Sequence, residues 1–356
     1  MLKPLVIIQT VVPSYRIKVF DEIQKQLKDG FKIYCGDSFF DSTIKTSINF
    51  KSTGTLKNHY ILGRRFLWQT GHWNEVFKDN VLVLSLNPRV ISHWIILLLR
   101  LLSRKRTILW GHAWPRSGQN SKSDKLRHLM RFFASEIIVY TEQQRRELQE
   151  KMAYKKITTA PNAVLYRHEM SSETDNEVND VIYVGRLIED KKPLLLYQGF
   201  KNALDSLPEK AKLIIIGDGP QRLKLVELSK KDDLEHRVTI PGKITDIDVL
   251  KSYYSKALVS ASPGYVGLSI TQSLGYGVPM IIARDEHHSP ELEAAKEDFN
   301  AQFFNSDDEN NLAQGLVLFF NEKDKWLNRR TEIVEYCKNT YSIEIMTRAF
   351  VNLVKV

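Results

Sequence analysis

The sequence predicts an α/β fold with two Rossmann-like domains in series, and two observations support that prediction. Short apolar segments alternate with amphipathic segments along most of the 356 residues, which is typical of parallel sheets covered by helices. The alternation is interrupted once, by a polar stretch with almost no apolar residues, and then restarts. The expected boundaries are an N-terminal domain over residues 1–165, a linker over 166–180, a C-terminal domain over 181–340 and a last helix over 341–356 that returns to the N-terminal domain.

Each element of the first half follows from its apolar pattern. Continuous apolar runs of about four to eight residues predict buried strands, and apolar residues at helical spacing predict helices. The expected strands are Leu5–Val12, Phe31–Cys35, a short one near His59–Leu62, Val81–Leu86, Thr107–Trp110, Glu136–Tyr140 and Ile157–Thr159. The expected helices are Tyr15–Leu27, Ile91–Leu102, Lys125–Phe133 and Glu142–Lys151.

The second half repeats the pattern. Val259–Ala283 combines a strand, a glycine turn, a helix and a second strand, which is a βαβ unit. Its turn, Gly264-Tyr265-Val266-Gly267, directs backbone N–H groups to a place where an anion is favoured, so it predicts a phosphate site, although any parallel crossover fits equally well. The expected strands are Val181–Val184, Lys212–Ile216, Val238–Ile240, Val259–Ser262 and Met280–Ala283, and the expected helices are Pro193–Leu204, Gln221–Lys230, Val249–Ser255, Leu268–Gly275 and Ile343–Val354.

Composition and charge narrow the protein class. Hydrophobic residues make up 43% and charged residues 26% of the chain, as in soluble globular proteins. Cys35 and Cys337 lie far apart without metal or redox spacing, which suits a reducing compartment. Residues 1–165 contain 27 Lys and Arg against 12 Asp and Glu, a net charge of +15, whereas the remainder contains 24 against 30, a net charge of −6. The basic half therefore predicts an anionic partner, either nucleic acid or a phospholipid surface.

Three other loops contain residues that suit an anionic or sugar ligand. Gly185-Arg186, followed by Lys191, places two cations after a strand. Gly217-Asp218-Gly219-Pro220 is a tight turn whose glycines permit close approach. His112 follows a strand at the edge where open α/β sheets bind ligands. Taken singly, these features are explained as well by a solvated loop, an ordinary turn and a packed histidine.

Taken together, VGRLIEDKKP, IIGDGP and SPGYVGLSITQSLGYGVPMI resemble glycosyltransferase family 4, whose members are retaining, nucleotide-sugar-dependent enzymes of the GT-B fold, with two Rossmann-like domains facing a cleft. PSYRIKVFDEI and WGHAWPR also resemble bacterial members that build surface polysaccharides. The resemblance implies that Arg186 and Lys191 bind the donor diphosphate and that His112 faces the transferred sugar, which makes these three the expected catalytic residues. It also implies donor contacts from Gly185, Gly217, Gly219, Gly264, Tyr265, Val266, Gly267, Leu268 and Gln272.

The sequence departs from the family pattern at two places. The family signature has two glutamates, and alignment puts Gly264 at the first and Gln272 at the second. Gln272 can still hydrogen-bond a ribose, whereas glycine has no side chain, so we expect an open space at Gly264 that alters the choice of donor sugar. The glycine pair that many members carry in the first strand–helix loop is replaced by Pro13-Ser14-Tyr15-Arg16.

One motif suggests a metal, and a simpler explanation is available. Asp246-Ile247-Asp248 matches the Asp-x-Asp pattern that holds a divalent cation in other glycosyltransferases. It also precedes a helix, where Asp is a normal N-cap, and we favour that interpretation. We expect no metal and no cofactor besides the donor, because Arg186 and Lys191 would neutralise the departing diphosphate.

The expected function is a metal-independent, retaining hexosyltransferase that moves a sugar from a UDP- or GDP-sugar to a lipid-linked glycan in bacterial surface polysaccharide synthesis. One alternative is a sugar-nucleotide epimerase of the same fold, which would need a pair of carboxylates as acid and base. The other alternative is a non-catalytic protein that binds nucleic acid through its basic half. That function would not explain why Arg186 and Lys191 are present in the glycosyltransferase-like motif.

An anionic membrane surface is the further partner that we expect. Ile91–Leu102 is very apolar, yet shorter than the ~20 residues that cross a bilayer, and Arg104-Lys105-Arg106 follows it. We expect Trp68, Trp73 and Trp94 at the headgroup level. The predicted location is cytoplasmic and peripheral, on the inner face of the cell membrane. The alternative is that this helix is an ordinary buried core helix.

Overall fold

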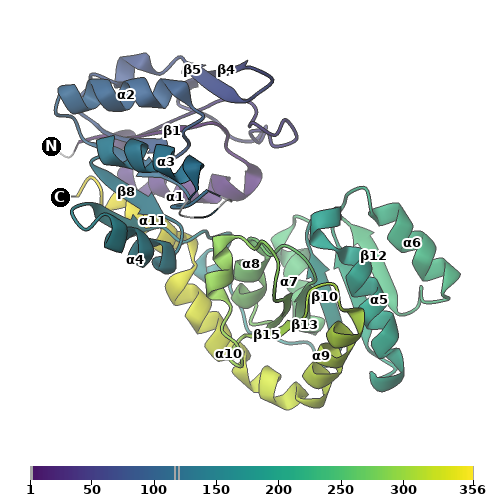
Figure 1. Cartoon of the computed structure of the whole chain (residues 1–356). Helices are drawn as coiled ribbons and strands as arrows, with labels where there is room; N and C mark the ends of the chain where they lie inside the picture. The colour runs from purple at the N-terminus through teal and green to yellow at the C-terminus, as the bar shows by residue number, and fades with distance from the viewer. Residues whose placement is uncertain (1–2, 116–117, 119–120, 356) are drawn as a thin grey trace. The chain divides into compact units, whose positions relative to one another are not determined.

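The computed structural model describes residues 3–115, 118 and 121–355, and its contacts divide the chain into two compact units (Figure 1). Unit 1 comprises residues 1–164 and 343–356, and unit 2 comprises residues 165–342. Each contains a parallel sheet covered by helices, so the predicted class, α/β with two Rossmann-like halves, is confirmed. Arg116, the last residue of the WGHAWPR segment, lies outside the described residues.

Within the described residues, the main sheet of unit 1 has seven parallel strands in the order β3-β2-β1-β6-β7-β8-β9. Because the strand order reverses between β1 and β6, the loops after these strands lie at the position where open α/β sheets bind ligands. The strands are β1 Leu5–Gln9, β2 Phe31–Cys35, β3 Gly54–Thr55, β6 Val81–Ser85, β7 Thr107–Trp110, β8 Glu136–Val139 and β9 Lys156–Thr159. The helices are α1 Ile17–Leu27, α2 Ile91–Leu102, α3 Lys122–Phe133, α4 Glu142–Lys151 and α11 Ile343–Val351.

Helices cover both faces of this sheet. Leu109 of β7 shares a core cluster with residues of α2 and α3. The next residue, Trp110, faces the other way, because successive side chains of a strand alternate between faces. Its ring lies 6.3 Å from that of Phe20 in α1 and 4.7 Å from that of Phe350 in α11. The last helix therefore packs on the N-terminal sheet, beside α1.

An antiparallel hairpin, β4 Lys57–Ile61 with β5 Phe66–Thr70, stands where the sequence predicts only one short strand. The second strand was missed because one of its buried positions is polar. Gln69 is fully buried, and its side chain bonds to Asn58 at 2.8 Å and to His93 at 3.0 Å. A buried amide breaks the apolar alternation that identifies a strand.

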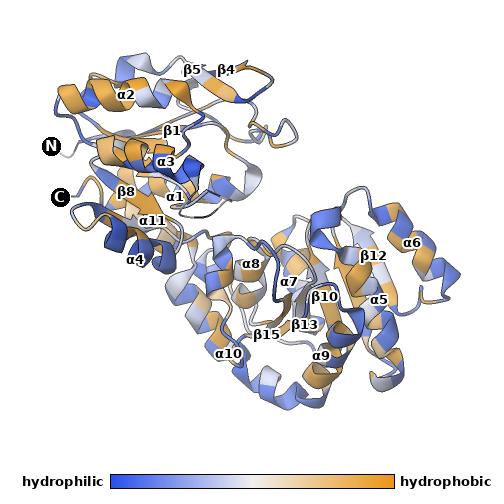
Figure 2. Cartoon of the chain, in the orientation of Figure 1, coloured by the Kyte–Doolittle hydropathy of each residue, from blue (hydrophilic) through white to orange (hydrophobic). Residues whose placement is uncertain are grey.

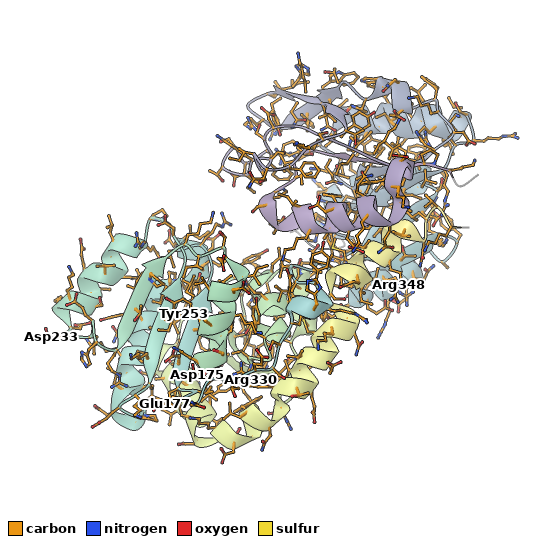
Figure 3. All side chains as sticks on the ribbon, turned by 180° about the vertical axis from the view of Figure 1, so that it is seen from behind. Asp175, Glu177, Asp233, Tyr253, Arg330 and Arg348 are labelled. Carbon is orange, nitrogen blue, oxygen red and sulfur yellow. The ribbon has the colours of Figure 1, made fainter. Side chains whose placement is uncertain are left out.

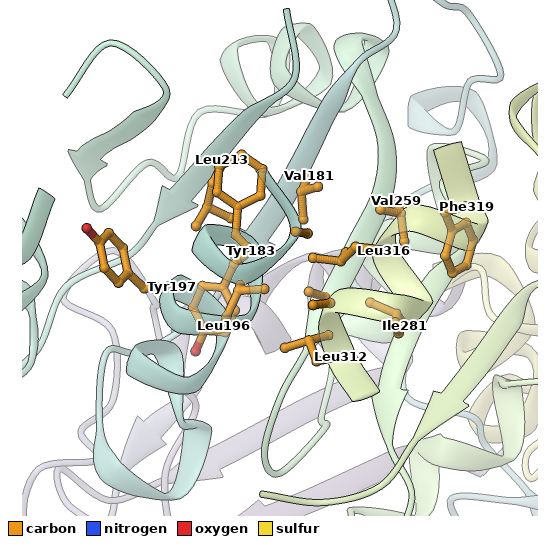
Figure 4. Packing of buried hydrophobic residues seen from close by; sticks show 14 of the residues in the cluster. Val181, Tyr183, Leu196, Tyr197, Leu213, Val259, Ile281, Leu312, Leu316 and Phe319 are labelled. Atoms are coloured by element: carbon orange, nitrogen blue, oxygen red, sulfur yellow. The ribbon is translucent and has the colours of Figure 1, made fainter. Parts of the chain in front are cut away.

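Unit 2 has six parallel strands among the residues described, in the order β12-β11-β10-β13-β14-β15. Numbered within the unit, this is the 3-2-1-4-5-6 order of a Rossmann fold, whose switch point lies between β10 and β13. The strands are β10 Asp180–Val184, β11 Lys212–Ile216, β12 Val238–Gly242, β13 Ala257–Ser262, β14 Met280–Ala283 and β15 Ala301–Phe304. The helices are α5 Pro193–Ala203, α6 Arg222–Lys231, α7 Ile247–Lys256, α8 Ser269–Gly275, α9 Glu309–Asn321 and α10 Lys323–Thr340. Figure 4 shows the core, in which Val181, Leu213, Val259 and Ile281 of four strands share a cluster with Leu196 of α5 and with Leu312, Leu316 and Phe319 of α9.

The sequence predicts no element between residues 284 and 342, yet β15, α9 and α10 lie there. The long helix α10 is held partly by a polar contact. Arg330 is buried inside unit 2 (Figure 3). Its guanidinium donates to the carbonyl oxygens of Tyr254, Ala257 and Tyr276 at 2.9, 2.9 and 3.0 Å. An arginine at a core position weakens the apolar periodicity from which a helix is predicted.

The polar stretch 166–180, expected to be a linker, belongs to unit 2. Its Ser171 N–H donates to the Gly275 carbonyl oxygen at 3.1 Å, and Met170 and Val178 are buried. The linker interpretation was wrong because it rested on exposed polar side chains, whereas the backbone and two apolar residues attach the segment to the unit.

Candidate functional site

In unit 2 the loops after β10 and β13 flank the switch point of the sheet and meet each other. The first contains Gly185, Arg186 and, in a short 3₁₀ helix (η5, Glu189–Lys191), Lys191. The second is the glycine turn 264–268. A backbone hydrogen bond joins them, from the N–H of Tyr265 to the carbonyl oxygen of Asp190, at 2.9 Å. The fold thus brings together two segments that lie about 75 residues apart in the sequence, at the edge where such sheets bind ligands.

Lys191 and Arg186 form a pair of cations at this junction. Lys191 Nζ donates to the Tyr265 carbonyl oxygen at 2.5 Å and lies 4.2 Å from the centroid of the Tyr265 ring. Burial, followed by the positive charge of Arg186, lowers the pKa of Lys191 to about 8. Arg186 is exposed, and neither cation forms an ion pair within the described part of the chain. Two neighbouring cations without a carboxylate in contact suit an anion with more than one charge.

Gly217 and Gly219 let a third loop approach the loop after β10. Their φ angles are 158° and 151°. A Cβ on Gly217 would lie 1.8 Å from the Gly185 carbonyl oxygen, and one on Gly219 would lie 2.5 Å from that of Leu187. These glycines are therefore required by the packing of the loops, and their contact with a donor stays a prediction.

The open space expected at Gly264 is absent, and that interpretation was wrong. A Cβ there would lie 2.4 Å from the Asp190 carbonyl oxygen and 3.0 Å from the Lys191 carbonyl carbon. The reason is that the loop after β10 packs directly on the turn. At Gly267, by contrast, a Cβ would meet nothing closer than the Tyr265 ring at 3.5 Å and Lys191 Nζ at 3.8 Å. The room beside the cations is at Gly267.

A segment that the sequence did not indicate, the loop after β14, covers the turn. The buried Val266 donates its N–H to His288 Nδ1 at 3.0 Å and accepts from the Ser289 N–H at 3.1 Å. His288 Nε2 in turn donates to the Ala283 carbonyl oxygen at 2.7 Å, so the ring is neutral, and burial lowers the pKa of His288. The expected donor N–H of Val266 is therefore already engaged. The available signal was the polar run Arg284-Asp285-Glu286-His287-His288-Ser289 directly after a buried strand.

The same loop supplies a carboxylate and a hydroxyl near the cations. Glu291, in the 3₁₀ helix η7 (Pro290–Ala294), is buried, and its charge raises the pKa of Lys191, against the larger effect of burial. The Ser289 hydroxyl oxygen is 4.0 Å from where a Cβ on Gly267 would lie. Ser289 of this loop thus lies beside the open side of the turn, and Glu291 lies close enough to Lys191 to affect its pKa, whereas Gly264 contributes no side chain.

The remaining donor residues lie on either side of the start of α8. Leu268 is the N-cap of this helix, and Gln272 is half-buried within it. The ribose contact expected of Gln272 stays a prediction.

His112 belongs to unit 1, where it follows the carboxyl end of β7. It is exposed, and its ring lies 4.7 Å from that of Tyr140. In the loop after β1, Arg16 takes the place of the missing glycine pair: it donates to Asn162 Oδ1 at 2.6 Å and lies 4.9 Å from the Trp110 ring. Of the three expected catalytic residues, unit 2 therefore brings together Arg186 and Lys191, and His112 lies at the corresponding edge of unit 1.

Asp246 is confirmed as a helix cap. Its Oδ1 accepts the Val249 N–H at 3.0 Å at the start of α7, and Asp248 lies in the first turn of that helix. Over residues 3–115, 118 and 121–355, no group of three or more His, Cys, Asp and Glu side chains is arranged to hold a metal ion.

Comparison with known proteins places these features in context. Residues 167–340, nearly all of unit 2, match the family described as glycosyl transferases group 1. The amylovoran biosynthesis glycosyltransferase AmsD of Erwinia amylovora is 25% identical over 210 residues, which cover 57% of this chain and 58% of that protein. A Campylobacter jejuni protein, named as an α-1,4-N-acetyl-D-galactosaminyltransferase acting on a GalNAc-containing glycan linked to undecaprenol, is 27% identical over 188 residues, 52% of this chain and 49% of that one. The chain thus spans about half the length of these curated relatives.

A solved structure covers the whole chain. Anabaena Alr3699/HepE in complex with UDP superposes with a TM-score of 0.69 over 99% of both chains, at 14% sequence identity. This likeness confirms the GT-B fold, and the family match confirms the expected resemblance to glycosyltransferases. Membership of family 4 in particular stays a prediction.

Proposed function

We propose that this GT-B protein, whose second unit matches the group 1 glycosyl transferases, transfers a sugar from a UDP- or GDP-sugar to a lipid-linked glycan. The reaction would retain the anomeric configuration, need no metal and contribute to a bacterial surface polysaccharide. The observation that supports this best is the cation pair Arg186 and Lys191 beside the turn 264–268, at the switch point of a Rossmann sheet.

The chemistry assigns a role to each cation. In glycosyl transfer the bond between the anomeric carbon and the diphosphate oxygen breaks, and negative charge grows on the departing diphosphate. Lys191, held by Tyr265, offers a fixed point charge, and the exposed Arg186 offers a planar pair of donors. Charge that increases as the bond breaks is stabilised more in the transition state than in the bound donor, which accelerates transfer.

The other partners follow from the surroundings and the relatives. The sugar would lie at the open side of Gly267, within reach of Ser289 and Glu291. The name of the Campylobacter relative gives an undecaprenol-linked acceptor and the Anabaena structure contains UDP, which supports a lipid-linked acceptor and a UDP-sugar here. His112 of unit 1 would face the transferred sugar, and the enzyme would work at the cytoplasmic face of the cell membrane.

Nucleotide binding tests the proposal. We expect UDP or GDP to raise the melting temperature, because a ligand that binds the native state stabilises it. Arg186→Ala and Lys191→Ala should each reduce that shift. Lys192→Ala is the matched control, since Lys192 Nζ is already paired with Glu286 at 2.5 Å and with Asp307 at 2.6 Å. Absence of any shift with UDP, GDP and their sugars would refute a nucleotide-sugar site.

Two further measurements separate the alternatives. When a nucleotide sugar is incubated without an acceptor, an epimerase would convert it into its epimer. A transferase would form no epimer under the same conditions. A nucleic-acid-binding protein would retain DNA or RNA on a filter, and Arg186→Ala would not affect that retention.

A further inference from the structure

Two helices of unit 1 expose an unusual amount of apolar surface. The described residues include 16 exposed large hydrophobic side chains, and seven of them lie on α2 and α3. The most exposed are Leu102 of α2, at 82%, and Phe132 of α3, at 54%. Scattered exposed leucines are ordinary on a protein surface, but a cluster of this kind marks an interaction site. The seven are Ile95, Leu98, Leu101, Leu102, Leu126, Leu129 and Phe132.

The exposed stripes of the two helices point the same way. Ile96 and Leu97 of α2 and Met130 of α3 are buried in one cluster against the same face of the sheet. The helices also pack against each other. Their opposite sides therefore face away from the sheet together. Figure 2 shows α2 as largely hydrophobic and α3 as a mixture of hydrophobic and hydrophilic residues. We call this surface, made by the seven side chains, the α2–α3 face.

Its surroundings are predominantly basic. Residues 80–135 contain ten Lys and Arg and a single acidic residue, Asp124. Asp124 is buried and paired with Arg131 and Lys151, each at 2.7 Å. Asp79, which precedes this segment, is exposed, pairs with Lys3 and lies close enough to Lys105 for the two charges to interact. Arg104, after α2, and Lys125, on α3, are exposed. The α2–α3 face thus presents apolar side chains bordered by cations, without an exposed carboxylate on either helix.

The most exposed apolar side chains near α2 and α3 are not the tryptophans that the sequence predicts at the headgroup level, and the headgroup contact of those tryptophans stays a prediction. Trp68 and Trp73 stack on each other at 5.6 Å and are half-buried. Trp94 is half-buried and donates to the Pro88 carbonyl oxygen at 3.0 Å. Arg106 is paired with Glu136 at 2.5 Å. The apolar contacts available are therefore leucines, Ile95 and Phe132.

We propose that the α2–α3 face docks on an anionic lipid bilayer. The apolar side chains would enter the boundary between headgroups and acyl chains, and the bordering cations would contact lipid phosphates. None of the described helices is long and apolar enough to cross a membrane. Two copies of the chain would repel each other through this predominantly basic face, and nucleic acid offers no partner for its leucines, so a bilayer fits best.

Vesicle binding of the full chain tests this without any substrate, so its failure is distinct from failure of the proposed transfer reaction. We expect flotation with vesicles of phosphatidylglycerol mixed with phosphatidylcholine, much weaker flotation with phosphatidylcholine alone, and release as salt rises. Combining Leu98→Gln, Leu102→Gln and Phe132→Gln should lower partitioning about tenfold or more. Combining Arg104→Gln and Lys105→Gln should also lower it about tenfold or more, since each cation near an anionic surface contributes about 1 kcal/mol.

Matched controls come from unit 2. Leu223→Gln with Leu318→Gln removes exposed leucines elsewhere, and Lys224→Gln with Lys230→Gln removes exposed cations elsewhere. Both should float like the parent chain. Equal recovery on neutral and anionic vesicles, or unchanged binding in folded α2–α3 variants, would overturn the proposal. So would a concentration-dependent dimer that the leucine substitutions abolish, because the face would then join two copies.

Discussion

In each unit the loop after the first strand contains an arginine. The two arginines differ in burial and in the contacts that they make. Both sheets reverse their strand order beside that strand, so Arg16 and Arg186 occupy similar positions in the two folds. Arg16 is buried and contacts Asn162 and Trp110, so its charge is used to hold unit 1 together. Arg186 is exposed, and its neighbour Lys191 is the second cation. The same residue type at the same place in a fold is thus buried and hydrogen-bonded in unit 1 and exposed in unit 2, where its contact with a ligand stays a proposal.

Surface chemistry separates the units in a second way. Exposed apolar side chains are concentrated on α2 and α3 in unit 1, whereas in unit 2 Leu223, Val249 and Leu318 lie on three different helices. Unit 1 is also the basic half of the sequence. The difference agrees with the two proposals made above, in which unit 2 would bind the small anionic donor and unit 1 would meet an extended anionic surface.

The largest effect expected comes from removing Arg186 or Lys191, the two cations of the loop after β10. Arg186→Ala or Lys191→Ala should lower kcat/KM for sugar transfer roughly a hundredfold or more, in line with the loss of one electrostatic stabiliser of the transition state. Arg16→Ala should instead lower the melting temperature, because it leaves buried partners without their hydrogen bond. Steady-state rates and thermal melts of the three variants check this. Near-native rates in both unit 2 variants would show that the cations do not act on the leaving group.

Elements and site residues could be predicted from the sequence where the pattern that identifies them lies within one short segment. The bounds of Ile91–Leu102, Thr107–Trp110 and Met280–Ala283 were predicted as observed, since each segment is predominantly apolar. The cation pair was also predictable, because its spacing lies within one loop. His288 and Glu291 were missed because their roles depend on how the loop after β14 folds back on a turn more than 20 residues earlier. Burial of Arg16 likewise depends on a contact with Asn162, which is distant in the sequence.

Acid should weaken unit 1 through two buried imidazoles. Burial lowers the pKa of His72 to about 4, and burial with the nearby His72 lowers that of His93 to about 3. The unfolded state titrates near 6.5, so below that pH it binds more protons and stability falls as pH decreases toward the folded values. Between pH 7.5 and 5.5 each histidine should cost ~1.3 kcal/mol. Denaturant unfolding across this range, followed by tryptophan fluorescence, measures the loss.

Two substitutions sharpen that measurement. His72→Phe keeps an aromatic ring beside Trp73 and should reduce the pH slope by about one proton. His236→Asn, at an exposed position of unit 2, should leave the slope unchanged. An acid slope that survives in His72→Phe would assign the lability to other groups.

A smaller effect is expected from the glycine turn of unit 2. Gly264→Ala should destabilise the unit by about 1–3 kcal/mol, because its Cβ meets backbone atoms of Asp190 and Lys191 that must move. Displacing Lys191 should also weaken nucleotide binding. Gly267→Ala is the matched control for stability, since its Cβ makes only ordinary contacts. Equal melting temperatures for the two variants would show that the backbone around the turn can shift to accommodate the added Cβ at little cost.

The smallest effect concerns metal: excess EDTA should leave turnover unchanged. In the proposed reaction, Arg186 and Lys191 would neutralise the departing diphosphate, and Asp246 is engaged as the cap of α7. Asp246→Asn preserves a good cap and should be silent, whereas Asp246→Ala should cost about 1 kcal/mol of stability and leave the rate per folded molecule intact. Turnover is measured with EDTA and again after Mg²⁺ or Mn²⁺ is restored. Complete loss in EDTA with recovery on either metal would mean that the two cations do not suffice for the leaving group, and that unit 2 needs a third positive charge.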